Sequence, residues 1–125
     1  MLTDYQTILI VDDEPAARRK LESMLTKICR YEQLIQACDG DEAVEKIRQY
    51  RPELVFMDIQ MPGMNGLQVA MHTREENYQL IMVTAFDNYA IEAFDTHAVD
   101  YLLKPVTQAK LNQSLEKVAA LHQRI

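Results

Sequence analysis

Five short segments rich in apolar residues, each separated from the next by 12 or more residues, constrain the fold of this chain most strongly. They lie at residues 7–11, 34–38, 54–57, 80–84 and 100–103. Strands that are almost wholly apolar are buried on both faces of a sheet, and connections long enough to hold a helix favour parallel neighbours. The pattern therefore predicts an α/β fold with a doubly wound, five-stranded parallel sheet.

The connections between these segments carry helical signals. Pro15 suits the first turn of a helix, and apolar residues follow it at intervals of three or four positions as far as the next strand. Asp41 is predicted to cap a second helix, Asn65 a short third one, and Thr107 a last helix that runs to the chain end. A weaker signal at residues 89–94 predicts the fourth helix.

Length and charge exclude several classes of protein. A chain of 125 residues has the usual size of a single domain, and its apolar content is that of a globular protein. The net charge of −6, with scattered basic residues, argues against nucleic-acid binding by this chain itself. No apolar run is long enough to span a membrane, and the first residues do not resemble a signal peptide, so we expect a cytoplasmic location without membrane contact.

The cysteines and histidines give no metal-binding pattern. Cys29 and Cys38 both lie within apolar patterns and are expected to be buried, reduced thiols. His72, His97 and His122 are scattered without the spacing of metal ligands, and we expect them at the surface.

Polar residues with a shared chemistry stand at the ends of four predicted strands. Asp12 and Asp13 follow the first strand, Asp58 follows the third, Thr84 ends the fourth and Lys104 follows the fifth. Each has an ordinary explanation alone, such as an acidic helix start for the Asp12–Asp13 pair. Together they would meet at the carboxyl edge of a parallel sheet, where ligands bind. Three carboxylates, a hydroxyl and an ammonium suit a divalent cation and a phosphoryl group.

Four motifs, in this order and spacing, make the chain resemble the receiver domain of two-component response regulators. They are the acidic pair in ILIVDDEP, the loop MDIQMPGMNG, the VTA that ends the fourth strand, and DYLLKP. The resemblance covers essentially the whole chain, residues 1–125. It implies a flavodoxin-like sheet with the strand order 2-1-3-4-5, and a phosphorylation-dependent signalling switch in place of a conventional enzyme.

The resemblance also implies how the carboxylates act. Asp58 would be the nucleophile that accepts a phosphoryl group from a phosphohistidine on a sensor histidine kinase. Asp13 and Asp58 would bind Mg²⁺ together with the backbone carbonyl of Gln60, and Asp12 would act mainly through a metal-bound water. The domain would assist its own phosphorylation and dephosphorylation.

The remaining roles concern the response to phosphorylation. Thr84 and Lys104 would hold the phosphoryl oxygens, and Tyr101, three positions before the lysine, would turn inward when Thr84 moves. The alternative is that Tyr101 is a half-buried strand residue without a switching role. The resemblance further implies a cis peptide bond between Lys104 and Pro105.

The segment TAFDNYAIEAFDTHAVDYLLKP is similar to receivers that are attached to LytTR-type DNA-binding domains. We therefore expect the natural protein to continue past Ile125 into a DNA-binding module that controls transcription, with no direct DNA contact by the receiver. A stand-alone receiver that binds another protein is the alternative. Phosphorylation is expected to promote a homodimer through the face of the fourth helix, fifth strand and fifth helix, with Ala90, Phe94 and Val99 as its apolar residues.

Three other functions fit the sequence less well. A magnesium-dependent phosphohydrolase would carry its nucleophile after the first strand with an acid two positions later, whereas Asp12 and Asp13 are adjacent. A flavin-binding module would need a hydroxyl- and glycine-rich loop where VDDEPAA stands. A pseudo-receiver that only dimerises would not need all five polar site residues.

Overall fold

Five parallel strands form one sheet in the order β2-β1-β3-β4-β5, which confirms the expected strand order. The structure is a computed structural model and describes residues 3–122. The strands are β1 (Thr3–Val11), β2 (Cys29–Ala37), β3 (Leu54–Met57), β4 (Gln79–Thr84) and β5 (Ala98–Leu103). β3 is buried along its whole length, as its four apolar residues predict.

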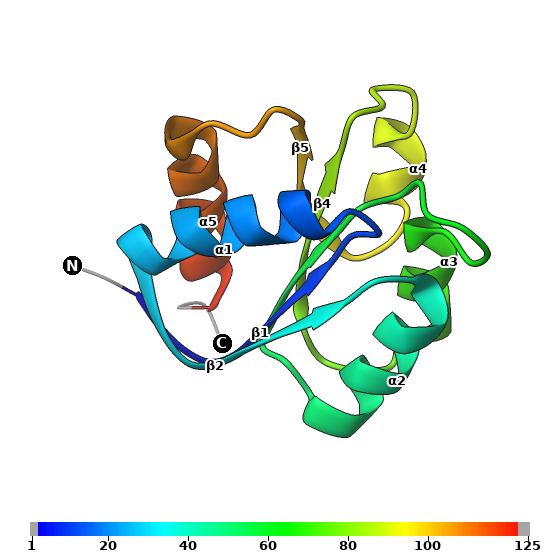
Figure 1. Cartoon of the computed structure of the whole chain (residues 1–125), viewed down its shortest axis with the longest axis horizontal. Coiled ribbons are helices and arrows are strands. Elements are labelled where there is room, and N and C mark those ends of the chain that lie inside the picture. The colour runs from blue at the N-terminus through cyan, green and yellow to red at the C-terminus, as the bar shows by residue number, and fades with distance from the viewer. Residues whose placement is uncertain (1–2, 123–125) are drawn as a thin grey trace.

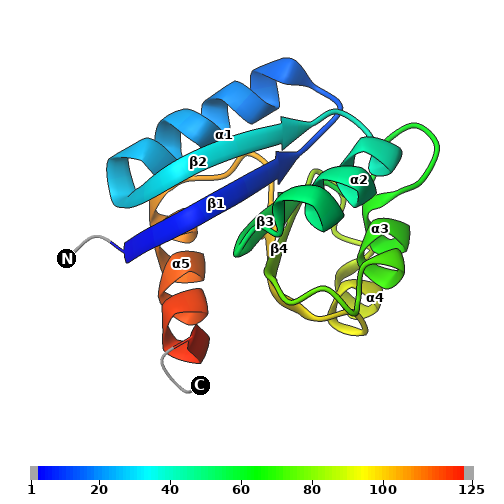
Figure 2. The ribbon, with the colours of Figure 1, turned by 90° about the horizontal axis from the view of Figure 1, so that it is seen from below.

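Five helices cover the two faces of the sheet (Figures 1 and 2). They are α1 (Pro15–Ile28), α2 (Gly40–Tyr50), α3 (Gly66–His72), α4 (Ala90–Phe94) and α5 (Gln108–His122). One buried cluster joins α1 and α5 to one face, and a second joins α2, α3 and α4 to the other. The two clusters pack the strands between two layers of helices. The residues that follow each strand are therefore positioned by a packed core.

β1 and β2 are longer than the sequence predicts. Each has nine residues, and their pairing starts at Thr3 and Cys29, so α1 passes directly into β2. Beyond the ends of the shorter strands these two form a two-stranded extension in which Asp4 pairs with Arg30 at 3.1 Å on the surface. Polar residues suit that exposed position, and the apolar runs therefore predict only the part of each strand that lies in the core.

Side-chain caps mark the starts of α2 and α3. Asn65 and Gln68 form a reciprocal capping box at the start of α3, as the sequence predicts for Asn65. The prediction for α2 is wrong, because Asp39, not Asp41, accepts the hydrogen bond from Glu42 N–H and α2 begins at Gly40. An acidic residue at either position favours the helix, so the charge pattern alone does not separate them. For α5, residues 123–125 lie outside the described part of the chain.

The two cysteines differ in their surroundings. Cys29 is buried at the start of β2, and burial raises the pKa of its thiol to about 11. Cys38 is exposed, so the expectation of two buried thiols is wrong for this residue. It stands one position beyond the last residue of β2, where the chain turns outward toward the cap of α2.

Among residues 3–122, no helix is long and apolar enough to cross a bilayer.

His97 is half-buried, which contradicts its expected surface position. Its ring packs edge-on against Tyr78 with 4.6 Å between ring centroids, and its Nε2 atom is buried without a hydrogen-bond partner in the described chain. Burial lowers the pKa of His97 below its ordinary value of 6.5. His72 is exposed, as expected, and the side chain of His122 lies outside the described residues.

The free energy of unfolding is expected to decrease as the pH is lowered, because His97 takes up a proton less readily in the folded chain than in the unfolded chain. In the unfolded chain His97 takes up a proton near pH 6.5, whereas in the folded chain it does so only at a lower pH. The contribution of neutral His97 to stability is therefore complete above pH 6.5 and is lost as the pH falls toward the folded pKa. His97→Phe keeps an aromatic ring against Tyr78 and should make this loss smaller between about pH 7 and pH 5. Urea unfolding of the parent, His97→Phe and the control His72→Gln measures it. Equal losses in the parent and His97→Phe would contradict the assignment.

Candidate functional site

Two of the predicted acidic residues lie side by side at the carboxyl edge of the sheet. Val11 of β1 is paired with Met57 of β3, so Asp12 and Asp58 follow their strands at the same level. The backbone N–H of Asp12 donates to the carbonyl of Ala37 (3.1 Å), and that of Asp58 donates to the carbonyl of Val11 (2.9 Å). These bonds fix the backbone of Asp12 and Asp58 at the edge of the sheet. Here the helices that follow the strands diverge to opposite faces.

The three predicted carboxylates form one cluster. One oxygen each of Asp12, Asp13 and Asp58 lies within 4.8 Å of the others. The side chains of Asp12 and Asp58 are each only 7% exposed, whereas Asp13 is open to solvent. Buried carboxylates this close repel one another and need a nearby cation.

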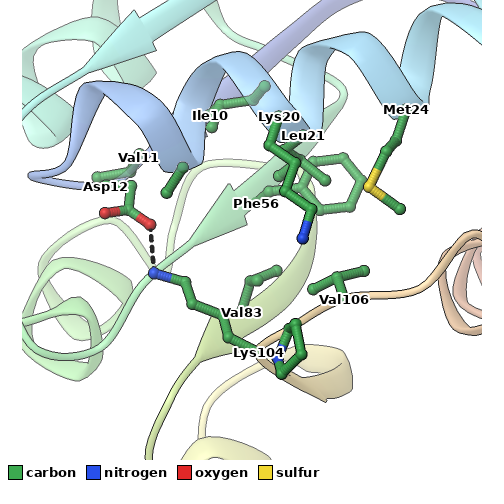
Figure 3. A pocket seen from close by; sticks show the side chains of 12 residues that line it. Ile10, Val11, Asp12, Lys20, Leu21, Met24, Phe56, Val83, Lys104 and Val106 are labelled. Atoms are coloured by element: carbon green, nitrogen blue, oxygen red, sulfur yellow. Dashed lines mark hydrogen bonds and ion pairs between the residues drawn. The ribbon is translucent and has the colours of Figure 1, made fainter.

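Lys104 supplies that cation in this structure. The register of β4 and β5 places it beside Thr84, whose carbonyl accepts from the Lys104 N–H at 2.9 Å. The expected cis peptide bond joins Lys104 to Pro105. The ammonium then reaches Asp12 Oδ2 at 2.6 Å and Asp58 Oδ2 at 2.9 Å, and the contact with Asp12 is drawn in Figure 3.

The charge state of Lys104 follows from this geometry. Burial alone would lower the pKa of its ammonium, but the hydrogen bonds to Asp12 and Asp58 and the charges of both carboxylates outweigh burial and raise it. Lys104 is therefore positively charged at neutral pH and is shared between two anions. This sharing was not expected from the sequence, where Lys104 was assigned only to phosphoryl oxygens.

Thr84 occupies the position predicted for a phosphoryl-binding hydroxyl. It is the last residue of β4 and is fully buried. Its Oγ1 atom has no hydrogen-bond partner in the described part of the chain. A buried hydroxyl without a partner costs free energy. A group with acceptor oxygens bound here would accept a hydrogen bond from Thr84 and remove that cost.

Three hydrogen bonds hold the loops that flank the site. The backbone N–H of Gln60 donates to Asp58 Oδ1 at 3.3 Å, while the Gln60 side chain donates to the hydroxyl of Tyr89 at 2.8 Å. Tyr101 is half-buried, and its hydroxyl donates to the backbone carbonyl of Phe86 in the loop after β4. The role of Tyr89 was not predicted, because nothing in the sequence indicates that it contacts the β3–α3 loop.

The residues proposed for a dimer face differ in exposure. Phe94 is 55% exposed, but Ala90 is only partly exposed and Val99 packs against the core beside α1 and α5. The large exposed apolar residue next to Phe94 is Ile91, at 81% exposure, which the sequence analysis did not select. In α4 only Ala93 is buried.

Arg18 is a further residue that the sequence analysis missed. Its guanidinium donates to the backbone carbonyl of Asp12 at 2.6 Å and to the side chain of Gln36 at 2.9 Å. The Glu14 N–H donates to Asp12 Oδ1 at 2.9 Å. These contacts fix the loop that carries the acidic pair, and their only signal in the sequence is that Arg18 lies on the first turns of α1.

The donor set fits a hard divalent cation such as Mg²⁺. Carboxylate and carbonyl oxygens are the ligands that Mg²⁺ prefers, and it commonly keeps several waters, which the exposed side of the cluster at Asp13 allows. Asp12, Asp13 and Asp58 would hold the ion, which would add to the positive charge that Lys104 already places beside them. The fit rests on oxygen chemistry and on the close approach of three acids.

Replacing Lys104 with methionine is expected to lower the free energy of unfolding by about 2 kcal/mol without divalent cations, because two largely buried carboxylates lose their partner. Mg²⁺ should stabilise this variant more than the parent. Urea unfolding in EDTA and in MgCl₂ measures both effects, with the exposed Lys110→Met as control. A variant as stable as the parent in EDTA would show that the ammonium is not needed to offset the acidic cluster.

A profile of the response regulator receiver domain matches residues 8–116. The chain belongs to this family. An uncharacterized response regulatory protein of Shewanella oneidensis is 42% identical over 113 residues, which cover 90% of this chain and 48% of that protein. The transcriptional regulatory protein BtsR of Escherichia coli K12 is 41% identical over 112 residues, which cover 89% of this chain and 47% of BtsR. The receiver chain thus spans about half the length of the curated relatives it matches.

Solved structures agree with this membership. The response regulatory domain of mrkE from Klebsiella pneumoniae superimposes with a TM-score of 0.87 at 24% identity, over 96% of this chain and all of that one, which shows the fold. The response regulator TrrA from Thermotoga maritima, solved in complex with Mg²⁺-BeF, gives a TM-score of 0.79 at 32% identity over 90% of this chain and 98% of that chain.

Proposed function

We propose that this receiver accepts a phosphoryl group on Asp58 from the phosphohistidine of a sensor histidine kinase, with Mg²⁺ bound by Asp12, Asp13, Asp58 and the backbone carbonyl of Gln60. The observation that carries the proposal is the convergence at Asp58. A largely buried carboxylate meets two other acids and a lysine ammonium 2.9 Å away. TrrA, a relative with the same fold, was solved with Mg²⁺-BeF, which supports a Mg²⁺-dependent site here.

The chemistry needs little more than positioning and charge. A carboxylate oxygen of Asp58 attacks phosphorus in line, the phosphorus–nitrogen bond of the phosphohistidine breaks, and the imidazole leaves with the bonding electron pair. Mg²⁺, when bound, neutralises charge on the phosphoryl oxygens. The Lys104 ammonium supplies a second positive charge beside Asp58, and the unpaired Thr84 hydroxyl offers a hydrogen bond from β4.

The same residues give phosphorylation a route to the surface. A phosphoryl group on Asp58 adds a charge of about −1.5 to −2 and new acceptor oxygens for Thr84 and Lys104. A shift of Thr84 and the loop after it would move the Phe86 carbonyl that the Tyr101 hydroxyl contacts. Tyr101 would then lose that partner and turn inward, which changes the surface of α4 and β5.

The activity that phosphorylation controls would be carried by another domain of the natural protein. The relatives are about twice as long as the matched region, and one of them is named a transcriptional regulatory protein. We infer that a DNA-binding domain of the LytTR type follows the receiver and that phosphorylation promotes a homodimer through α4, β5 and α5 in the cytoplasm. A stand-alone receiver that binds another protein remains the second candidate, and the exposed Ile91 and Phe94 favour protein binding in either case.

Incubation with acetyl phosphate and Mg²⁺ is expected to add one phosphoryl group per chain, because the proposal assigns a single acceptor, Asp58, among the three clustered carboxylates. EDTA should prevent the reaction. Intact mass spectrometry measures the label, and hydroxylamine should remove it, as expected for an acyl phosphate.

The control reaction separates this function from the rival hydrolase. A receiver stops at one phosphoryl group per chain, whereas a phosphohydrolase would turn over a small phosphate ester such as p-nitrophenyl phosphate. Absence of label with Mg²⁺, or sustained ester turnover, would refute the proposal.

A further inference from the structure

An apolar cavity of about 320 Å³ opens between α1 and the loop from β5 to α5 (Figure 3). Leu21 and Met24 line it from α1, Phe56 and Val83 from the sheet, and Val106 from the loop. Phe56 is only 1% exposed and Val83 only 6%, so the inner wall is part of the hydrophobic core. This volume and lining are in the range of sites that bind small molecules.

The two ends of the cavity differ in charge. At one end, the Lys104 ammonium is already paired with Asp12, which also lines the cavity. On the α1 side, the exposed Lys20 lines the rim, and its side chain extends from α1 toward the loop that carries Val106 (Figure 3). Lys20 takes part in none of the ion pairs among residues 3–122. An anionic group would therefore meet Lys20, while Asp12 would repel it from the end beside Lys104.

We propose that this cavity binds a small amphiphilic carboxylate, such as a medium-chain fatty acid or an aromatic acid. The apolar part packs among Met24, Phe56 and Val83, and the carboxylate lies against Lys20. An apolar cavity with one unpaired cation at its rim selects for this combination, because a neutral apolar molecule leaves the ammonium unused and a cation is repelled by it.

Occupancy of the cavity also bears on the acceptor site. Lys104 and Pro105 form part of the wall, and Val83 precedes Thr84 on β4. A bound acid would therefore lie beside the stem of the lysine that holds Asp58. Binding itself needs no phosphorylation and is measured on the unmodified protein, so its failure and the failure of the proposed phosphoryl transfer are distinguishable.

Sodium octanoate is the probe, with acetate as a head group without a tail and octylammonium as the same tail with a cation. Methyl NMR spectra of the labelled protein should show saturable shifts at Met24, Val83 and Val106 with octanoate alone. Lys20→Gln should weaken octanoate binding about fivefold, as for a charge-assisted contact at a partly exposed site. Lys27→Gln, on the same helix but outside the cavity lining, should leave it unchanged.

A cavity-filling variant gives the second test. Ala17 lines the cavity from α1, and Ala17→Leu should abolish the octanoate shifts because the added side chain occupies the space. If that variant does not fold, the octanoate affinity of Lys20→Gln, a substitution at an exposed residue, tests the proposal by itself. Equal shifts with acetate or octylammonium, unchanged affinity in Lys20→Gln, or octanoate shifts mainly at the exposed Ile91 and Phe94 would each overturn the proposal.

Discussion

Replacing Asp58 with asparagine is expected to abolish labelling of this chain by acetyl phosphate. The amide has nearly the same shape and can still accept the Gln60 N–H, but it is a poor nucleophile and carries no charge for Lys104 or a cation. The change also removes one of three close carboxylates, so the fold should be retained. Intact mass with and without acetyl phosphate measures the loss, and circular dichroism checks the fold.

Asp87→Asn is the matched control for this result. Asp87 is an exposed acid in the loop after β4, at the same edge of the sheet, and is not part of the acidic cluster. Its replacement removes the same charge from the protein and should leave one phosphoryl group per chain. Labelling that persists in Asp58→Asn would assign the acceptor to another residue and refute the mechanism proposed for this site.

Gly66→Ala is expected to lower the free energy of unfolding by about 3 kcal/mol or more, because the new Cβ has no space. A Cβ atom at this position would lie 2.2 Å from the backbone oxygen of Asp58 and 3.0 Å from the Ile59 Cα. Both neighbours are backbone atoms, so α3 must move away from the loop that carries the acceptor. Urea unfolding measures the loss, and acetyl phosphate labelling should become slower in the same variant.

Gly63→Ala distinguishes this clash from a general effect of removing glycine. Gly63 has φ +75, and nothing lies within 4 Å of the position of its missing Cβ. Alanine there meets only the cost of a left-handed backbone conformation, about 1 kcal/mol. Equal losses in the two variants would mean that close packing of α3 on the acceptor loop is not what Gly66 provides.

The sequence predicts the buried part of the fold well and the exposed part less well. Apolar runs predict β3 within its observed bounds, since all of it lies in the core. They do not predict the first residues of β1 and β2, because this part of the sheet is partly exposed and its polar residues resemble a loop. The same limit applies to His97, whose packing against Tyr78 depends on residues 19 positions apart in the chain.

Most of the site could also be predicted, because parallel strands bring their carboxyl ends to one edge. Asp12, Asp58 and Lys104 converge there as expected. The sequence does not show that Lys104 bridges two carboxylates, nor that Gln60 contacts Tyr89. These contacts depend on side-chain conformations and on loops that approach each other in space, and no periodic pattern encodes them.

The position of Lys104 in the sheet has a mechanical consequence. β5 is an edge strand and is separated from β3 by β4, yet the ammonium of Lys104, which follows β5, contacts the residues that follow β1 and β3. The two ion pairs are thus a noncovalent cross-link over the top of β4. Phosphorylation of the Asp58 carboxylate would change one anchor of that cross-link, so β5 would respond directly, without a relay through β4.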